Sequence, residues 1–278
     1  MKKLRLGLWV VTLGFVTAAL FHPTWVLLQP VYRYLMVVDI TQSMHARDYH
    51  LLGLPSERLA FAKAALEQAI LNLPCGSQIG LGIFTHKDTE LLLEPLEVCQ
   101  HAPSLRTALR NIDWRSAWAA DSFIAYGLFD ALRAAEGLQA DLVFLTDGDQ
   151  FPKTPSDPGF FGRPARGWLV GVGGMRPVPI PKLDFEGRLL GYWQITDLSR
   201  DRDLLPRRAE LLLSRLDETH LRQLANITGL EYFQLMTPQQ LVQNLRRPDL
   251  AKTLPTEVDL RPWLGALAFF AALAAMLI

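Results

Sequence analysis

The sequence has few cysteines, no excess of charge of either sign and none of several common catalytic motifs. Its 278 residues include 28 basic and 28 acidic side chains, so the formal net charge at pH 7 is zero. That balance, with no recognised nucleic-acid motif, argues against binding to DNA or RNA. No G-x-S-x-G elbow is present, which disfavours a serine hydrolase. The glycines of residues 167–174 lack the spacing of the dinucleotide-binding fingerprint.

The first 24 residues form a long apolar run behind three cations. Lys2, Lys3 and Arg5 precede a stretch that carries no charge from Leu6 to Phe21. This pattern is typical of a signal peptide or of an uncleaved signal anchor. The small residues 17–19 resemble a cleavage site, but the apolar stretch continues past them, which favours an anchor that spans the membrane.

A second uncharged run of residues closes the sequence at 263–278. A helix of this run would be about 24 Å long, short of a hydrocarbon core of about 30 Å. It could insert if Arg261 and Trp263 lie in the interface. A buried core helix is the weaker alternative, because no later residues would cover it. We therefore expect a second membrane segment at residues 261–278.

Charge and cysteine placement predict where the middle of the chain lies. By the positive-inside rule, the N-terminal cations stay in the cytoplasm, so the middle domain faces the periplasm of a bacterial inner membrane. Arg261 would then lie on the outer side, which opposes this arrangement. Cys75 and Cys99, the two cysteines of the chain, have no zinc-ligand spacing. In an oxidising compartment we expect them to form a disulfide.

Between the ends, short apolar runs alternate with amphipathic stretches. Apolar runs separated by helices predict a parallel sheet that is covered on both faces. We therefore expect an α/β domain over residues 30–250, with a doubly wound, mostly parallel sheet flanked by helices. Residues 183–216 interrupt the alternation and predict an insertion with a hairpin. The expected strands are 33–39, 78–84, 90–93, 140–149, 167–174 and 230–235, and the expected helices begin near residue 54, at 103, near 122, at 218 and at 237.

Hydroxyl and carboxylate side chains follow the ends of predicted strands. Asp39, Thr41 and Ser43 stand at alternate positions after the first buried strand, and Asp147 follows another. Ser122 opens a predicted helix. Taken singly, each has an ordinary interpretation: Asp, Ser and Thr form turns, and Ser is a favoured helix cap. Ligands of parallel sheets, however, bind beyond the carboxyl ends of the strands, where these residues would meet.

Together, the two carboxylates and three hydroxyls predict a site for a hard divalent cation. Mg²⁺ prefers oxygen ligands and is usually held by one or two protein carboxylates. Ca²⁺ or Mn²⁺ would suit the same donors. Two carboxylates only roughly cancel the charge of a dication, so the ion remains a strong electrophile. An open coordination position on it would then accept a carboxylate from another protein.

The pattern resembles the von Willebrand factor A domain and its metal-ion-dependent adhesion site, over about residues 32–245. The Asp-x-Ser-x-Ser motif of that family matches residues 39–43, with Thr41 in place of the first Ser. The family's later Thr falls on Ser122 and its strand-end Asp on Asp147. The resemblance implies that the three hydroxyls contact the ion, and that both aspartates act largely through water. Asp121 stands where the family commonly has Gly.

A narrower resemblance concerns membrane-anchored von Willebrand A proteins that are encoded with bacterial methanol-dehydrogenase clusters. It rests on DITQSMHARDY, LPCGSQIGLGIFT, the DWRSAWAADS run, FLTDGD and GRLLGYW. This resemblance implies a role in assembly or maturation of a periplasmic dehydrogenase, and a functional link to a MoxR-type AAA+ ATPase. Such an ATPase is cytoplasmic, so coupling would need the membrane segments or another protein.

Two other classes of function remain open on the sequence. A metal-dependent hydrolase of the haloacid-dehalogenase type would need a second Asp where Thr41 stands, so catalysis is disfavoured. A structural module that binds no metal gains some support from the departures at Thr41 and Asp121. The aromatic residues Trp114 and Trp118 could form a partner-facing patch or pack in the core. We expect a non-enzymatic binding domain whose loops 44–50, 113–121 and 149–166 surround the metal contact.

Overall fold

The computed structural model describes residues 2–119, 121–150, 158–194, 197 and 212–277. The chain divides into two compact units. A terminal unit combines residues 1–30 with residues 252–278, and a central unit comprises residues 31–251. Each unit is described by itself below, and the candidate site lies in the central unit.

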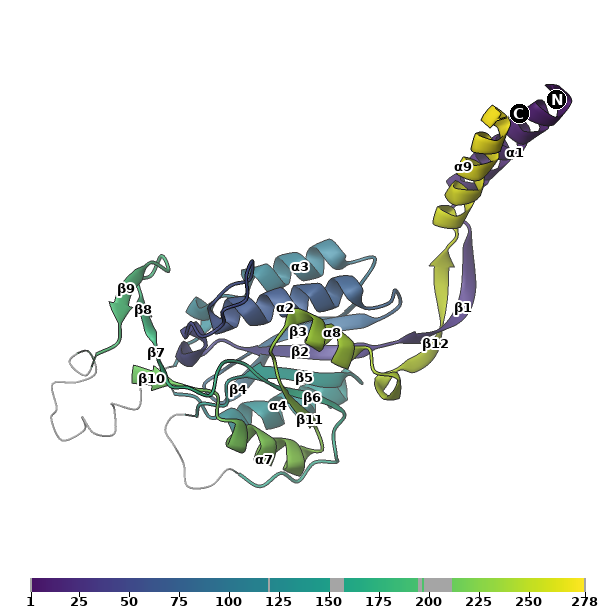
Figure 1. Ribbon diagram of the computed structural model, residues 1–278. Helices are drawn as coiled ribbons and strands as arrows, with labels where there is room; N and C mark the ends of the chain where they lie inside the picture. Colours follow the sequence, from purple (N-terminus) through teal and green to yellow (C-terminus); the bar gives the residue numbers. More distant parts are fainter. Residues whose placement is uncertain (1, 120, 151–157, 195–196, 198–211, 278) are drawn as a thin grey trace. The chain divides into compact units, whose positions relative to one another are not determined.

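A six-stranded sheet forms the middle of the central unit (Figure 1). Five strands are parallel, and the edge strand β4 runs antiparallel to β3. The predicted fold class, a mostly parallel sheet flanked by helices, is confirmed. In spatial order the strands are β11 (Glu231–Gln234), β6 (Gly167–Gly171), β5 (Asp141–Thr146), β2 (Arg33–Asp39), β3 (Gln78–Thr85) and β4 (Asp88–Glu97).

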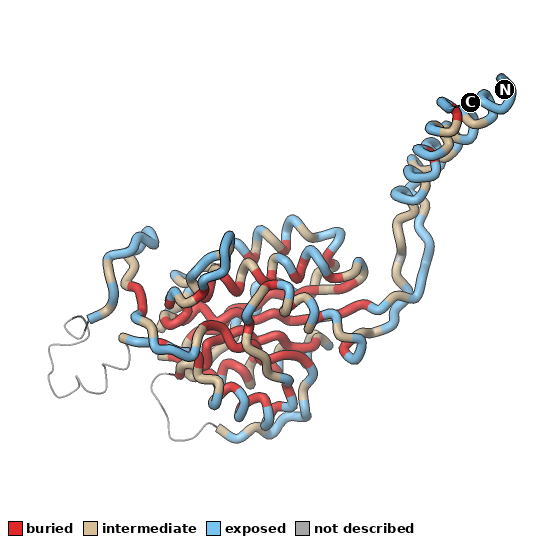
Figure 2. Tube along the Cα trace, in the orientation of Figure 1, coloured by how far each residue is buried: buried red, intermediate tan, exposed pale blue. Residues whose placement is uncertain are grey.

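Helices cover both faces of this sheet. Adjacent residues of β2 enter different cores, as the two-residue repeat of a strand requires. Met36 and Val38 pack in the core with α2 (Arg58–Asn72), α3 (Ala102–Asn111) and α8 (Pro238–Leu245). Leu35 and Val37 pack in the second core with α4 (Ile124–Gly137) and α7 (Glu218–Thr228). Figure 2 shows the consequence: the middle of the unit is buried and the outer helix faces are exposed.

The order of the strands places a switch point between β2 and β5. From β2 the chain passes through α2 to β3 on one side, and it later returns to β5 on the other side of β2. At such a reversal the loops beyond the carboxyl ends of two neighbouring strands diverge and leave room for a ligand. Asp39 ends β2, and Asp147 follows the last residue of β5. The fold therefore brings two predicted metal ligands to the switch point.

The loop 149–166 does not surround the metal contact along its whole length, as the sequence analysis expects. Its residues 151–157 lie outside the described residues. Residues 160–166 lie against α4 and the first residues of β5, and Leu142 N–H donates to Arg166 O. Since β5 and β6 are parallel, the connection between them must return to the amino edge of the sheet. The prediction is wrong for this part of the loop.

Short elements surround the sheet. The insertion begins with a hairpin, as the sequence predicts, formed by β8 (Pro181–Leu183) and β9 (Leu189–Tyr192). A second short pair joins β7 (Val178–Pro179) to β10 (Leu213–Ser214). Residues 195–196 and 198–211 of the insertion lie outside the described residues. Among the described residues, 3-10 turns also occur at η1 (Gln42–His45), η2 (Trp114–Ser116) and η5 (Pro248–Leu250).

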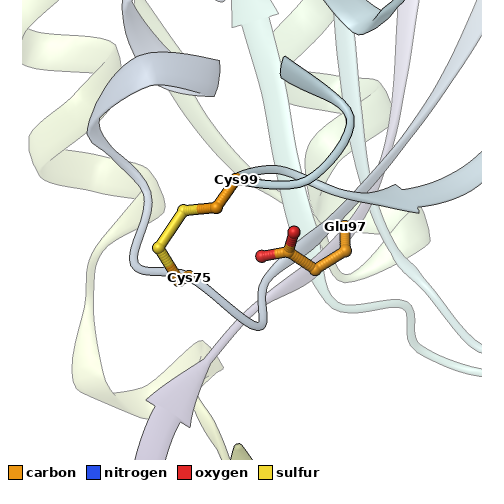
Figure 3. Close-up of side chains that lie close together, drawn as sticks. All are labelled: Cys75, Glu97 and Cys99. Carbon is orange, nitrogen blue, oxygen red and sulfur yellow. A yellow bond between two sulfur atoms is a disulfide. The ribbon is translucent and has the colours of Figure 1, made fainter. Parts of the chain in front are cut away.

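Cys75 and Cys99 form a disulfide in the central unit, with Cα atoms 5.3 Å apart (Figure 3). The bond joins the loop after α2 to the turn that follows β4. The carboxylate of Glu97 points toward it and accepts hydrogen bonds from the backbone N–H groups of Gly76 and Gln100. The same carboxylate and sulfurs lie close enough together to hold an ion. The sulfurs are bonded to each other, however, and thiolates are the form of cysteine that binds metals.

The terminal unit consists of two helices and two strands. α1 (Lys2–Leu20) is long and apolar enough to cross a membrane, and α9 (Arg261–Leu277) is shorter. The two helices contact each other, and both chain ends lie at the same end of the unit (Figure 1). β1 (Thr24–Val31) pairs with β12 (Lys252–Asp259), a strand pair that the sequence analysis does not predict.

Candidate metal centre

Asp39 is the centre of a hydrogen-bonded group at the carboxyl edge of the sheet, and its side chain is completely buried. Its Oδ1 accepts hydrogen bonds from the backbone N–H and the hydroxyl of Thr41, at 2.8 and 2.6 Å. Its Oδ2 accepts one from Thr146 Oγ1, at 2.6 Å, across the β2–β5 pair. Thr41 Oγ1 lies 3.5 Å from Ser43 Oγ. Three of the five predicted ligands therefore form one connected group.

The surroundings of Asp39 disfavour its negative charge. Burial raises the pKa of Asp39 to about 7, and the charge of Asp147 adds to the rise, while the hydrogen bonds from Thr146 and Thr41 oppose it. Without a cation, protonated and ionised forms of this carboxyl are therefore similarly populated near neutral pH. A nearby cation would favour the ionised form.

Asp147 is paired with a buried guanidinium. Arg58 Nη1 donates a hydrogen bond to Asp147 Oδ2 at 2.8 Å, and neither side chain is exposed. The same guanidinium donates from Nη2 and Nε to Asp48 Oδ2, at 2.6 and 3.0 Å, and from Nη1 to Ser214 Oγ at 2.7 Å. The second oxygen of Asp147 accepts the N–H of Asp149 at 3.0 Å. Burial opposes the charge of Arg58, but the two aspartates offset it, so its pKa is raised.

Glycines make room for this guanidinium. Gly173 has a φ of +107°, and a Cβ at this position would lie 2.3 Å from Arg58 Nε. Its N–H donates to Tyr49 Oη at 3.0 Å, and the N–H of Gly174 donates to Asp48 Oδ2 at 2.8 Å. The turn formed by these glycines after β6 therefore orients the acidic partner of Arg58.

Ser122 is a buried hydroxyl with no hydrogen-bond partner among the residues that the structure describes. It does not cap α4, because the cap position belongs to Phe123. The backbone of Ser122 forms an isolated bridge with His86, two residues beyond Phe84, the residue opposite Asp39 in the β2–β3 register. Ser122 therefore lies at the same edge of the sheet as Asp39, and its oxygen remains available.

The donors present suit a divalent cation. When Asp39 is ionised, Asp39, Asp48, Asp147 and Arg58 together carry a formal net charge of −2, and none of the four side chains is more than 7% exposed. Such a charge is costly to bury unless a cation balances it. The hydroxyl oxygen of Ser122 adds a buried atom that needs a partner. Carboxylate and hydroxyl oxygens are ligands that Mg²⁺ and Ca²⁺ accept.

Sequence reasoning missed Arg58, Thr146, Asp48 and Ser214. Thr146 could have been found, because it directly precedes Asp147 at the end of a strand. Arg58 gives no such signal, since an arginine in the first turn of an amphipathic helix is ordinarily solvated. Its pairing with Asp147 spans 89 residues of sequence and exists only in the fold.

Comparison with known proteins agrees with this architecture. Residues 34–150 match the family model of the von Willebrand factor type A domain. This part of the chain, less than half of its length, is similar to the von Willebrand factor A (vWA) domain. The match includes all five predicted metal ligands and Arg58, but it ends before β6 and the insertion.

Two solved structures share the vWA fold of this chain. BatB from Bacteroides thetaiotaomicron is 17% identical, with a TM-score of 0.54, and the match covers 78% of this chain and 98% of that one. An aerotolerance-related membrane protein from Bacteroides fragilis is also 17% identical, with a TM-score of 0.51, over 77% and 98% of the two chains. At this identity the likeness concerns the fold. A comparison with curated protein sequences finds no match.

Proposed function

We propose that this protein is a membrane-tethered, non-enzymatic vWA domain that binds a partner protein through a divalent cation, Mg²⁺ or alternatively Ca²⁺ or Mn²⁺. Asp39, Thr41, Ser43, Ser122 and Asp147 would hold the ion. When bound, the ion supplies a positive charge that attracts an acidic side chain of the partner. The terminal helix α1 would attach the domain to the membrane.

The observation that carries the proposal is the buried hydroxyl of Ser122, which has no hydrogen-bond partner in the described part of the chain. Buried polar groups are nearly always hydrogen-bonded, and one without a partner needs an explanation. This hydroxyl lies at the edge of the sheet where Asp39 and Asp147 are buried with an excess of negative charge. An ion at that edge would satisfy the hydroxyl and balance the carboxylates together.

Ser122→Ala provides the sharpest test, because Ser122 Oγ has no hydrogen bond to lose in the described structure. The full chain in lipid nanodiscs is melted in EDTA and in Mg²⁺, Ca²⁺ or Mn²⁺. An ion at about 100 times its Kd stabilises the native state by about 2.7 kcal/mol. For a domain of this size the wild-type midpoint should then rise by about 5–10 °C. Ser122→Ala should match wild type in EDTA and show a smaller rise with the ion.

Thr228→Val is the matched control. Thr228 is a buried hydroxyl in α7 that donates to Leu224 O, away from the predicted ligands. This variant should lose stability in EDTA but keep the full ion-dependent rise. An equal rise in wild type and Ser122→Ala, or no rise with any of the three ions, would contradict the proposal. Asp147→Ala is a poorer test, because it also leaves Arg58 without its buried partner.

The Arg58–Asp147 ion pair favours a second candidate, a structural vWA module that binds no metal. In that case the guanidinium is the counter-ion of Asp147, and Asp39 is partly protonated near neutral pH. The melt distinguishes the two candidates. A structural module would show the same midpoint in EDTA and in each ion.

The proposed location and partner class extend the same function. The N-terminal cations, the disulfide and the apolar helix α1 support an inner-membrane protein whose vWA domain faces the periplasm. The narrower sequence resemblance supports a role in assembly or maturation of a periplasmic enzyme such as methanol dehydrogenase, with a functional link to a MoxR-type AAA+ ATPase. Protease added to sealed spheroplasts should cleave the central unit if it faces the periplasm and spare it if it faces the cytoplasm.

A further inference from the structure

A cavity of about 290 Å³ opens next to the candidate metal centre, within the central unit. Three loops contribute to its walls: the turn after β2, the segment before Ser122 and the hairpin of the insertion. Indole rings and aliphatic side chains form most of the lining. The residues used in the argument are Ile40, Gln42, Trp114, Trp118, Leu183 and Trp193.

The cavity and the candidate metal centre are parts of one surface. Ile40 and Gln42 line the cavity, and they alternate in sequence with the predicted ligands Asp39, Thr41 and Ser43. Successive Cα atoms are only 3.8 Å apart. On the second loop, Trp118 precedes Ser122 by four residues. A ligand bound at the ion would therefore lie close to the cavity.

The lining predicts an apolar occupant with one polar contact. Trp118 is 54% exposed and lines the cavity beside Trp114 and Trp193, so together these rings form an apolar surface that an occupant would cover. Trp114 packs against the core and also lines the cavity. The indole Nε1–H of Trp193 is buried and has no acceptor among the described residues. An occupant that brings a backbone carbonyl would supply the missing acceptor.

The rim of the cavity does not by itself favour an acidic or a basic occupant. Arg115 stacks on Trp114 and Lys182 on Trp193, with 5.2 Å from each cation to the ring centroid. Each cation is also paired with an aspartate, at 2.6 Å. The rim is therefore nearly neutral. Recognition of an acidic group falls to the ion, and the cavity recognises what lies beside it.

We propose that the cavity binds an apolar side chain, aromatic or large aliphatic, of the same partner segment that presents an acidic residue to the ion. The proposal rests on the proposed function for the acidic residue and deepens it. The partner is recognised by an extended peptide segment in which the apolar and acidic residues lie within about three positions of each other. The spacing follows from the reach of an extended chain, about 3.3–3.6 Å per residue.

A random peptide library displayed on phage tests this proposal. The full chain in lipid nanodiscs serves as bait in Mg²⁺, because detergent could itself fill the cavity, and empty nanodiscs remove lipid binders. We expect peptides that pair Asp or Glu with Trp, Phe, Leu or Ile at a fixed spacing. The affinity of an enriched synthetic peptide is then measured by fluorescence anisotropy, with and without EDTA.

Two exposed aromatic residues make a matched pair of variants. Trp118 and Tyr126 each lie four residues from Ser122, and they are 54% and 51% exposed, but only Trp118 lines the cavity. Trp118→Ala should weaken binding of the peptide at least about tenfold, as expected for an aromatic side chain that becomes buried in the complex. Tyr126→Ala should change the affinity less than about threefold. Trp193→Phe, which keeps a ring and removes the N–H, should give an intermediate loss.

The outcomes separate this inference from the proposed function. Equal effects of Trp118→Ala and Tyr126→Ala, or enriched peptides with an acid and no apolar neighbour, would overturn the cavity proposal and leave the metal site intact. Binding that depends on Trp118 but ignores EDTA would support the cavity and overturn the role of the ion. Failure to enrich any peptide above empty nanodiscs would overturn the cavity proposal.

Discussion

Arg58 Nη1 lies 2.8 Å from Asp147 Oδ2, and both side chains are completely buried. A single guanidinium thus joins the start of α2 to the loop beyond β5. Through Asp48 it also reaches the loop that follows β2. The carboxyl edge of the sheet is therefore held by an internal ion pair, and this arrangement determines how variants at the site should behave.

Arg58→Met should destabilise the folded protein strongly. It removes the positive charge from two nearly buried aspartates, and breaking a buried ion pair on one side costs about 3–5 kcal/mol. The free energy of unfolding is measured by chemical denaturation of the full chain in nanodiscs. Arg106→Ala is the control, because its pair with Glu67 is partly exposed and should contribute no more than about 1 kcal/mol. Equal losses in the two variants would contradict the structural role of Arg58.

Asp39→Asn should abolish ion binding and leave the domain folded. The amide keeps the shape of the side chain and an acceptor for the N–H of Thr41, but it removes a charge that the ion requires. Asp39→Ala should likewise abolish binding, with a greater loss of stability, because Thr41 and Thr146 lose their acceptor. Calorimetric titration with Mg²⁺, alongside circular dichroism, checks both variants. A retained heat of binding in Asp39→Asn would remove Asp39 from the ligand set.

Affinity for the ion should fall as the pH drops below about 7. Burial and Asp147 raise the pKa of Asp39 to about 7, so an incoming ion must displace a proton below that pH. We expect the affinity to fall by up to about tenfold per pH unit between pH 7 and pH 5. Calorimetry in buffers of different ionisation enthalpy counts the released protons. Affinity that stays constant from pH 8 to pH 5 would contradict this prediction.

Without an ion, Asp39 should make the protein less stable as the pH rises from about 4 to about 7. Its carboxyl has an ordinary pKa of 3.8 and a raised pKa in the folded state. Within that window the folded chain holds a proton that the unfolded chain has released, so the free energy of unfolding decreases with pH. Denaturation of wild type in EDTA should show this decrease, and Asp39→Asn should show less of it.

Loss of the disulfide should destabilise the central unit by about 3.5 kcal/mol. Cys75 and Cys99 are 24 positions apart. Closing a loop of this length lowers the conformational entropy of the unfolded chain, which stabilises the folded state by about that amount. The double variant Cys75→Ser, Cys99→Ser is compared with wild type by denaturation, before and after reduction. Reduction should lower the free energy of unfolding of wild type to that of the variant, and it should leave the variant's free energy of unfolding unchanged. A response of the variant to the reductant would show that the effect does not come from this bond.

Local patterns predict most of the sheet correctly. The apolar run ending at Asp39 and the run before Asp147 are strands, because residues buried on both faces of a parallel sheet leave continuous apolar stretches. The helix over residues 103–111 follows from the spacing of its apolar residues, Leu105 and Leu109 among them. The pairing of β1 with β12 was not predicted. It joins segments more than 200 residues apart, so no hairpin turn between them indicates that they pair.

The candidate site is predictable in part. Asp39, Thr41 and Ser43 could be grouped from their alternate positions, and Asp147 from its place after a strand. The alternative in which Ser122 taken singly caps the helix is wrong, because Phe123 takes that position, and the serine hydroxyl has no hydrogen-bond partner among the described residues. Sequence spacing cannot distinguish these two roles, which differ by a single residue in where the helix begins.

The sequence by itself determined the class of fold, the oxygen-rich ends of two strands and the apolar character of both termini, because each is a pattern of neighbouring residues. The tertiary structure alone decided that Arg58 neutralises Asp147 and that three tryptophans meet beside the candidate metal centre. These relationships join residues that are far apart in the chain. Their physical basis is burial: charges and indole rings acquire their roles only when the folded chain excludes water from around them.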